Sequence, residues 1–104
     1  MRLLGAVPAP GYALVVAVER EVEGARRPEL WSLVTASARW QRVWSGAVGD
    51  AVTAMRVDGM HPEMQRGEGE SRRWEQADFT VAPPEEEAVT ASVVRTLQDT
   101  GLWR

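Results

Sequence analysis

The sequence contains no cysteine, and this absence excludes disulfides, thiolate metal sites and thiol nucleophiles. Lysine, asparagine and isoleucine are also missing, so all 12 basic residues are arginine. The codon usage of a GC-rich bacterium accounts for these gaps together, because it disfavours AT-rich codons. The formal net charge of −3 lacks the basic excess that is typical of nucleic-acid binding, so we expect no nucleic-acid partner.

Long apolar runs are absent as well. The longest candidate, residues 13–18, has the length of a strand and falls well short of the roughly 20 residues that span a bilayer. Residues 2–5 are followed by Pro8 and Pro10, which interrupt any secretory signal. We therefore expect a cytoplasmic protein with no membrane partner. The 104 residues allow one domain, residues 1–104, whose core draws on 44% hydrophobic residues and five tryptophans.

The N-terminal half carries a hairpin signal. Residues 12–22 alternate so that Leu14, Val16 and Val18 share one face, which predicts a strand. Residues 23–25 supply a turn, and residues 29–34 predict a second short strand. Residues 1–11 predict an N-terminal arm. Residues 57–82, rich in glycine and charge, predict a flexible insertion, although residues 73–81 also fit a strand around Trp74.

Three helices are expected after this hairpin. Residues 35–46 fit either a strand or a helix, and we favour the helix because Trp40, Val43 and Trp44 then share one face. Residues 49–56 predict a short helix. The final helix follows Pro83 and Pro84, carries carboxylates at 85–87, buries residues 89, 93, 94 and 97, and stops at 101. The fold class is therefore α+β, a small antiparallel hairpin or three-stranded sheet packed with three helices, similar to a winged helix.

The residues that support catalysis are scarce. His61 is the single histidine, and its His-x-Glu order lacks the cysteine pair of zinc deaminases. No serine lies in a nucleophile elbow, and residues 67–70 fit a flexible acidic turn better than a phosphate loop. Residues 85–87 point about 100° apart on a helix and so do not converge on one ion. We therefore predict no catalytic residue, no metal and no cofactor, with a small enzyme using His61 as an alternative.

Two segments carry a family resemblance. Residues 33–38 (Leu-Val-Thr-Ala-Ser-Ala) are followed by 40–46 (Trp-Gln-Arg-Val-Trp-Ser-Gly), and residues 93–102 end in Gly-Leu. With the short helix at 50–55, this order resembles the PqqD-like family, the leader-peptide recognition domains (RiPP recognition elements) of pathways that modify ribosomally made peptides. Two features depart from that family: Val34 stands where an asparagine is common, and the 57–82 connection is longer.

The resemblance implies a non-catalytic module that captures the leader of a precursor peptide by β-augmentation. It would present that leader to a modifying enzyme or a leader protease. The backbone of residues 30–34 would pair with the leader, and the final helix would line the groove. The implied peptide-binding residues are Leu30, Trp31, Ser32, Leu33, Val34, Ala91, Val94, Arg95 and Gln98.

Two other interpretations stay open. Residues 31–46, taken as strand, resemble the W-x-x-V-A-T-x-x-A core strand of phage head-closure proteins, which implies a β-rich structural protein that assembles into a ring. An immunity-type partner protein also fits the acidic charge. Dominant helix would favour the recognition module, whereas dominant strand would favour the structural protein.

Overall fold

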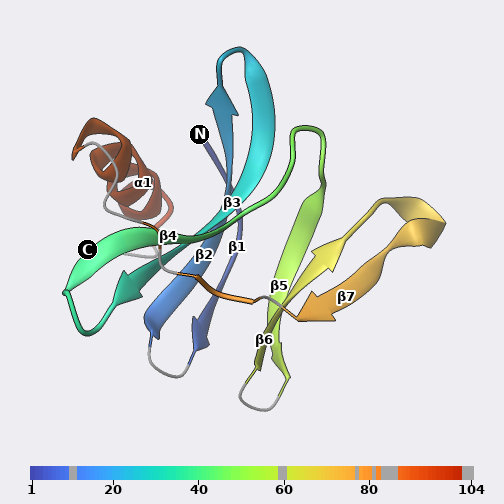
Figure 1. Cartoon of the computed structure of the whole chain (residues 1–104), viewed down its shortest axis with the longest axis horizontal. Coiled ribbons are helices and arrows are strands. Elements are labelled where there is room, and N and C mark those ends of the chain that lie inside the picture. Colours follow the sequence, from blue (N-terminus) through green and yellow to red (C-terminus); the bar gives the residue numbers. More distant parts are fainter. Residues whose placement is uncertain (10–11, 59–60, 77, 81, 83–86, 102–104) are drawn as a thin grey trace.

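The computed structural model describes residues 1–9, 12–58, 61–76, 78–80, 82 and 87–101. Within these residues two antiparallel sheets each follow the order of the sequence (Figure 1). The first contains β1 (Arg2–Ala9), β2 (Tyr12–Val22), β3 (Ala25–Val34) and β4 (Arg39–Ser45). The second contains β5 (Val52–Asp58), β6 (His61–Arg66) and β7 (Arg73–Gln76). A 3-10 turn (Gly69–Ser71) and one helix, α1 (Glu87–Asp99), complete the described elements.

The four-stranded sheet is the middle of three layers. Between it and the second sheet lies a core of buried residues: Val7, Val15, Ala17, Leu30, Val43, Val52 and Met64. Its other face packs under α1 with a second core: Val16, Val18, Trp31, Trp40, Val93 and Leu97. Both faces of β2 are therefore buried, which explains why its apolar residues run consecutively through 15–18 instead of alternating with polar ones.

The expected fold class is wrong. Three helices on a hairpin or three-stranded sheet were predicted, whereas the described residues form seven strands in two sheets and one α-helix. The N-terminal arm expected at 1–11 contains β1, which pairs with β2 along its length. The expected flexible insertion at 57–82 contains β6, β7 and the end of β5.

The decisive error concerns residues 35–46. The chain turns through residues 35–38, where Ala38 has a φ of 55° and donates its N–H to the Val34 carbonyl at 2.8 Å. It then returns as β4, whose large apolar side chains are divided between the two faces. Trp40 joins the core under α1, whereas Val43 and Trp44 pack between the sheets. The change of face occurs at an irregularity in the β3–β4 register, between Arg42 and Trp44. A helix gathers these side chains on one face, but the middle layer of a three-layer fold requires apolar residues on both.

The helix expected at 49–56 is also absent, because residues 52–58 form β5. Val52 is buried between the sheets, and Met55 packs against the same core. A register shift between Val52 and Ala54 places these residues three positions apart on one side of the strand. The spacing that predicted a helical turn is therefore produced by a β-bulge.

Two predictions are confirmed. Residues 12–22 form a strand that returns through a turn at Glu23 and Gly24, both with positive φ, into β3. The final helix buries Val93 and Leu97, packs Val89 and Val94 against the same core, and is followed by Gly101 at a φ of 79°. The residues expected to open this helix, 83–86, and the final Leu102 and Trp103 lie outside the described residues.

Two contacts set how the layers meet. A Cβ added to Gly5 would lie 3.2 Å from the Met55 backbone nitrogen, so β1 and β5 approach closely at this glycine. At the opposite side, the N–H groups of Thr80 and Ala82 donate to the carbonyls of Val43 and Arg42 at 2.9 and 2.8 Å. The segment after β7 thus covers part of the β4 edge. Among the described residues, α1 is too short and too polar to cross a membrane.

Candidate functional site

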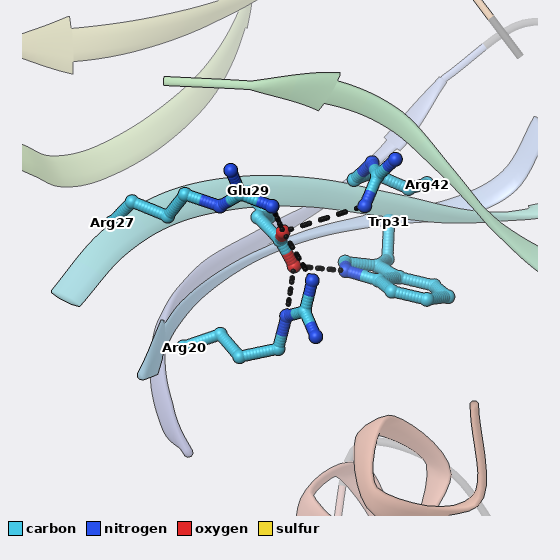
Figure 2. A network of polar contacts seen from close by, with 5 residues as sticks. All are labelled: Arg20, Arg27, Glu29, Trp31 and Arg42. Carbon is cyan, nitrogen blue, oxygen red and sulfur yellow. Dashed lines mark hydrogen bonds and ion pairs between the residues drawn. The ribbon is translucent and has the colours of Figure 1, made fainter. Parts of the chain in front are cut away.

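The most unusual side chain in the structure is a fully buried carboxylate. Glu29 lies in β3, and its side chain has a relative exposure of 0%. An ionised carboxylate is stable in such a place only when charges and hydrogen bonds replace its lost hydration. The surroundings of Glu29 supply both, as Figure 2 shows.

Three arginines and a tryptophan surround this carboxylate. Arg20 binds it in a bidentate manner, with Nε donating to Oε1 at 2.9 Å and Nη2 donating to Oε2 at 3.0 Å. The indole Nε1 of Trp31 donates to Oε1 at 3.1 Å. Arg27 and Arg42 place Nη atoms 3.3 and 3.6 Å from Oε2. Both oxygens of the carboxylate are thereby engaged. We call these five residues the Glu29 cluster.

The alternation of the strands brings these residues together. Arg20 of β2 lies directly opposite Arg27 of β3, and Arg42 of β4 lies opposite Trp31. Glu29 is two residues from both Arg27 and Trp31, so all three project from one face of β3. This is the face that packs under α1 through Trp31, so the cluster borders the core that the helix covers.

The electrostatics of the cluster keep Glu29 ionised. Burial by itself raises the pKa of the Glu29 carboxyl, but hydrogen bonds from Arg20 and Trp31 and the charges of Arg20 and Arg42 outweigh it, so the net pKa lies below the ordinary 4.5. A carboxylate held in this state neither donates a proton near neutral pH nor readily accepts one. Its physical role is to bind the guanidinium groups of three adjacent strands, which favours structure over acid–base catalysis.

The guanidinium groups of the Glu29 cluster lie where the buried core meets the surface. Three of them contact one carboxylate, and their side chains keep 17%, 29% and 22% exposure for Arg20, Arg27 and Arg42. They therefore reach solvent at the root of the β2–β3 hairpin.

The residues implied to pair with a leader peptide occupy an interior strand. Residues 30–34 lie between two strands: all of them pair with β4, and all except Leu33 pair with β2. Leu30, Trp31 and Ser32 are fully buried, and the Ser32 hydroxyl donates to the Leu14 carbonyl at 3.0 Å. The structure therefore leaves no open strand edge at Leu30–Val34 for a peptide to join.

The remaining candidate residues are divided between core and surface. Val94 of α1 and Leu33 of β3 are partly buried and pack against the core under the helix, which contains Trp31. Ala91, Arg95 and Gln98 are exposed on α1, and Val34 is half-buried at the end of β3. His61 is exposed at the start of β6, opposite Asp58. Among the described residues, no group of three His, Asp or Glu side chains is arranged to hold a metal ion.

Sequence reasoning missed the Glu29 cluster. One signal was available: Glu29 is the single charged residue within 28–34, a segment that is otherwise apolar apart from a serine. A lone carboxylate in a strand with apolar neighbours needs a cationic partner. Arg20 and Arg42 are visible in the sequence as candidates, but they meet Glu29 only once residues 39–45 are recognised as a strand.

A scan against protein-family models, a search of the curated proteins and a search of the solved structures each returned no match to this chain.

Proposed function

We propose that this protein is a non-catalytic structural or assembly component, of the kind that phage head-closure proteins represent, and that it acts through contacts with other protein subunits. The observation that carries the proposal is the β2–β3 hairpin, which projects beyond the rest of the middle sheet (Figure 1) from a root where Glu29 binds arginines of three strands. The prevalence of strand also favours this interpretation over a helical recognition module.

The hairpin extends past both neighbouring strands. The last β1–β2 pair joins Arg2 to Glu19, and the last β3–β4 pair joins Glu29 to Ser45. Beyond these positions residues 20–22 pair with residues 25–27 alone, apart from one backbone bond from Gly49 to the Arg26 carbonyl at 3.2 Å. A two-stranded ribbon of this kind is marginally stable by itself. We call residues 19–28 the hairpin arm.

Charged contacts hold the hairpin arm in place. The Glu29 cluster fixes its root, and Glu19 pairs with Arg26 across its other face at 3.6 Å. These contacts tie the arm to the edge of the core at Trp31 and Glu29, and their effect is to keep the exposed part of the arm ordered. An ordered arm loses little conformational entropy when it meets a partner, which suits a docking element.

The test is to isolate the tagged protein gently from the cells that naturally produce it and to determine the composition of the recovered complex by native mass spectrometry. We expect a complex of fixed stoichiometry that contains other protein subunits. Arg26→Glu, at the exposed hairpin arm, should weaken this complex. Arg95→Glu makes the same change of charge on the exposed face of α1 and serves as the matched control. Recovery of the monomer alone, or equal loss with both variants, contradicts the proposal.

A further inference from the structure

The outer edge of β7 differs from the other strand edges of the molecule. Part of the β4 edge is covered by Thr80 and Ala82, and β5 approaches β1 closely at Gly5. In the described part of the chain, β7 pairs with β6 on one side and has no strand on the other. It lies at the margin of the molecule, far from α1 (Figure 1). Every second residue of such an edge directs its N–H and C=O groups outward.

We propose that β7 pairs with β7 of a second copy of this chain, antiparallel and about a two-fold axis through Trp74. The sequence 72–76, Arg-Arg-Trp-Glu-Gln, is complementary to itself in this register. Arg73 lies opposite Glu75 of the second copy, and Glu75 lies opposite Arg73 of the second copy. The contact is isologous, so one surface supplies both sides.

The charges select this register. Arg73 and Glu75 share one face of β7, and their side chains are 61% and 43% exposed. Within one chain Glu75 contacts Arg73 at 3.8 Å and Arg66 at 3.5 Å, so the second copy would add an arginine to a carboxylate that is already paired. Moving the axis to Arg73 or to Glu75 sets like charges directly opposite each other, which is unfavourable. Charged side chains on a short edge discourage pairing, and they do so most when like charges would meet across the ladder. An edge with unlike charges two residues apart lacks that protection against its own copy.

The centre of the proposed contact is aromatic. Trp74 is half-buried, and the guanidinium carbon of Arg56 lies 4.1 Å from the centroid of its ring. Arg56 is itself held by Glu63, whose Oε1 accepts from Nε at 2.7 Å. The indole is therefore covered on one side and ordered before any partner arrives. Two such rings meeting on the axis form the kind of cross-strand aromatic pair that stabilises antiparallel ladders.

This inference rests on the proposed assembly role and names one of its partners, a second copy. The test uses sedimentation velocity on the recombinant chain across a range of concentrations. We expect reversible dimers, and we expect Arg73→Glu and Glu75→Arg each to raise the dissociation constant by roughly tenfold or more, since each sets like charges opposite each other. Mixing the two variants in equal amounts should restore dimers, because the mixed pair has unlike charges at both positions. Arg26→Glu is the control and should dimerise normally.

A second variant covers the case in which a charge reversal disturbs the fold. The chain has no cysteine, so Trp74→Cys places a thiol on the proposed axis, where it faces its own copy. Mild oxidation should yield covalent dimers from Trp74→Cys and far fewer from Gln76→Cys, which faces residue 72. Monomers at every concentration, failure of the mixed variants to associate, or equal cross-linking at both positions overturns the inference. A complex isolated from the natural cells would still support the assembly role in that event.

Discussion

Removing the charge of Glu29 is the sharpest test of the structure. Glu29→Gln keeps the shape of the side chain but turns one acceptor oxygen into a donor that faces arginine donors. Loss of one partner from a buried ion pair costs about 3–5 kcal/mol. The arginines here keep 17–29% exposure, so water recovers part of that cost. We therefore expect a loss of about 2–4 kcal/mol in the free energy of unfolding, after discounting for solvent screening.

Denaturation in urea, followed by tryptophan fluorescence, measures this loss. Trp31 donates to Glu29, so the same variant should also change the emission of the folded state. Glu19→Gln is the matched control, since Glu19 belongs to the same hairpin and pairs with an Arg26 side chain that is 70% exposed. That exposed pair is worth about 0–1 kcal/mol. If Glu29→Gln costs no more than Glu19→Gln, the cluster does not stabilise the fold and the reasoning is refuted.

Three further predictions concern pH and packing. The folded pKa of Glu29 lies below its ordinary 4.5, so the stabilisation by the Glu29 carboxylate is present above that pH and disappears as the pH falls through the lower folded value. In acid titrations, the difference in unfolding free energy between wild type and Glu29→Gln should therefore shrink below about pH 4.5. A difference that stays constant with pH contradicts this prediction. Leu97→Ala should cost about 2–5 kcal/mol because Leu97 is fully buried under α1, whereas the exposed Gln98→Ala should cost little in the same urea titration. Gly5→Ala should lower the free energy of unfolding by about 1–3 kcal/mol through overpacking, because the new Cβ meets Met55 at 3.2–3.3 Å. An unchanged melting temperature would contradict this prediction and would show that the two sheets move apart easily.

The sequence correctly predicted two elements, the β2–β3 hairpin and α1, because each is encoded by a pattern of neighbouring residues. The β2–β3 hairpin has an apolar run, a turn at Glu23 and Gly24, and a second run, and it forms, although β3 begins at Ala25 and not at the predicted residue 29. α1 has a periodic apolar face and a glycine after its last turn, and it also forms. Both signals depend on residues a few positions apart, which a sequence displays directly.

The predictions were wrong for segments whose secondary structure depends on what packs against them. Trp40, Val43 and Trp44 have helical spacing, but they serve two cores on opposite sides of β4. Val52 and Met55 have the spacing of a helical turn because β5 is irregular between them. Neither the presence of a third layer nor the position of a bulge follows from spacing within one segment. A helix at residues 35–46 would leave β3 with an open edge, whereas in the protein β4 pairs along it.

The Glu29 cluster was hidden for the same reason, since its members come from three strands and span 23 positions of the sequence, from Arg20 to Arg42. The position of the Glu29 cluster also explains where the hairpin arm emerges from the buried core into solvent. The fully buried apolar residues of β2 end at Val18, and Arg20 follows on the same face, so the cluster marks the point where burial under α1 gives way to solvent. At that boundary the Glu29 carboxylate binds the arginine nearest the root on each strand of the arm, Arg20 on β2 and Arg27 on β3. Loss of Glu29 should therefore loosen the arm before it unfolds the two cores, and hydrogen exchange in Glu29→Gln should rise first at residues 20–27.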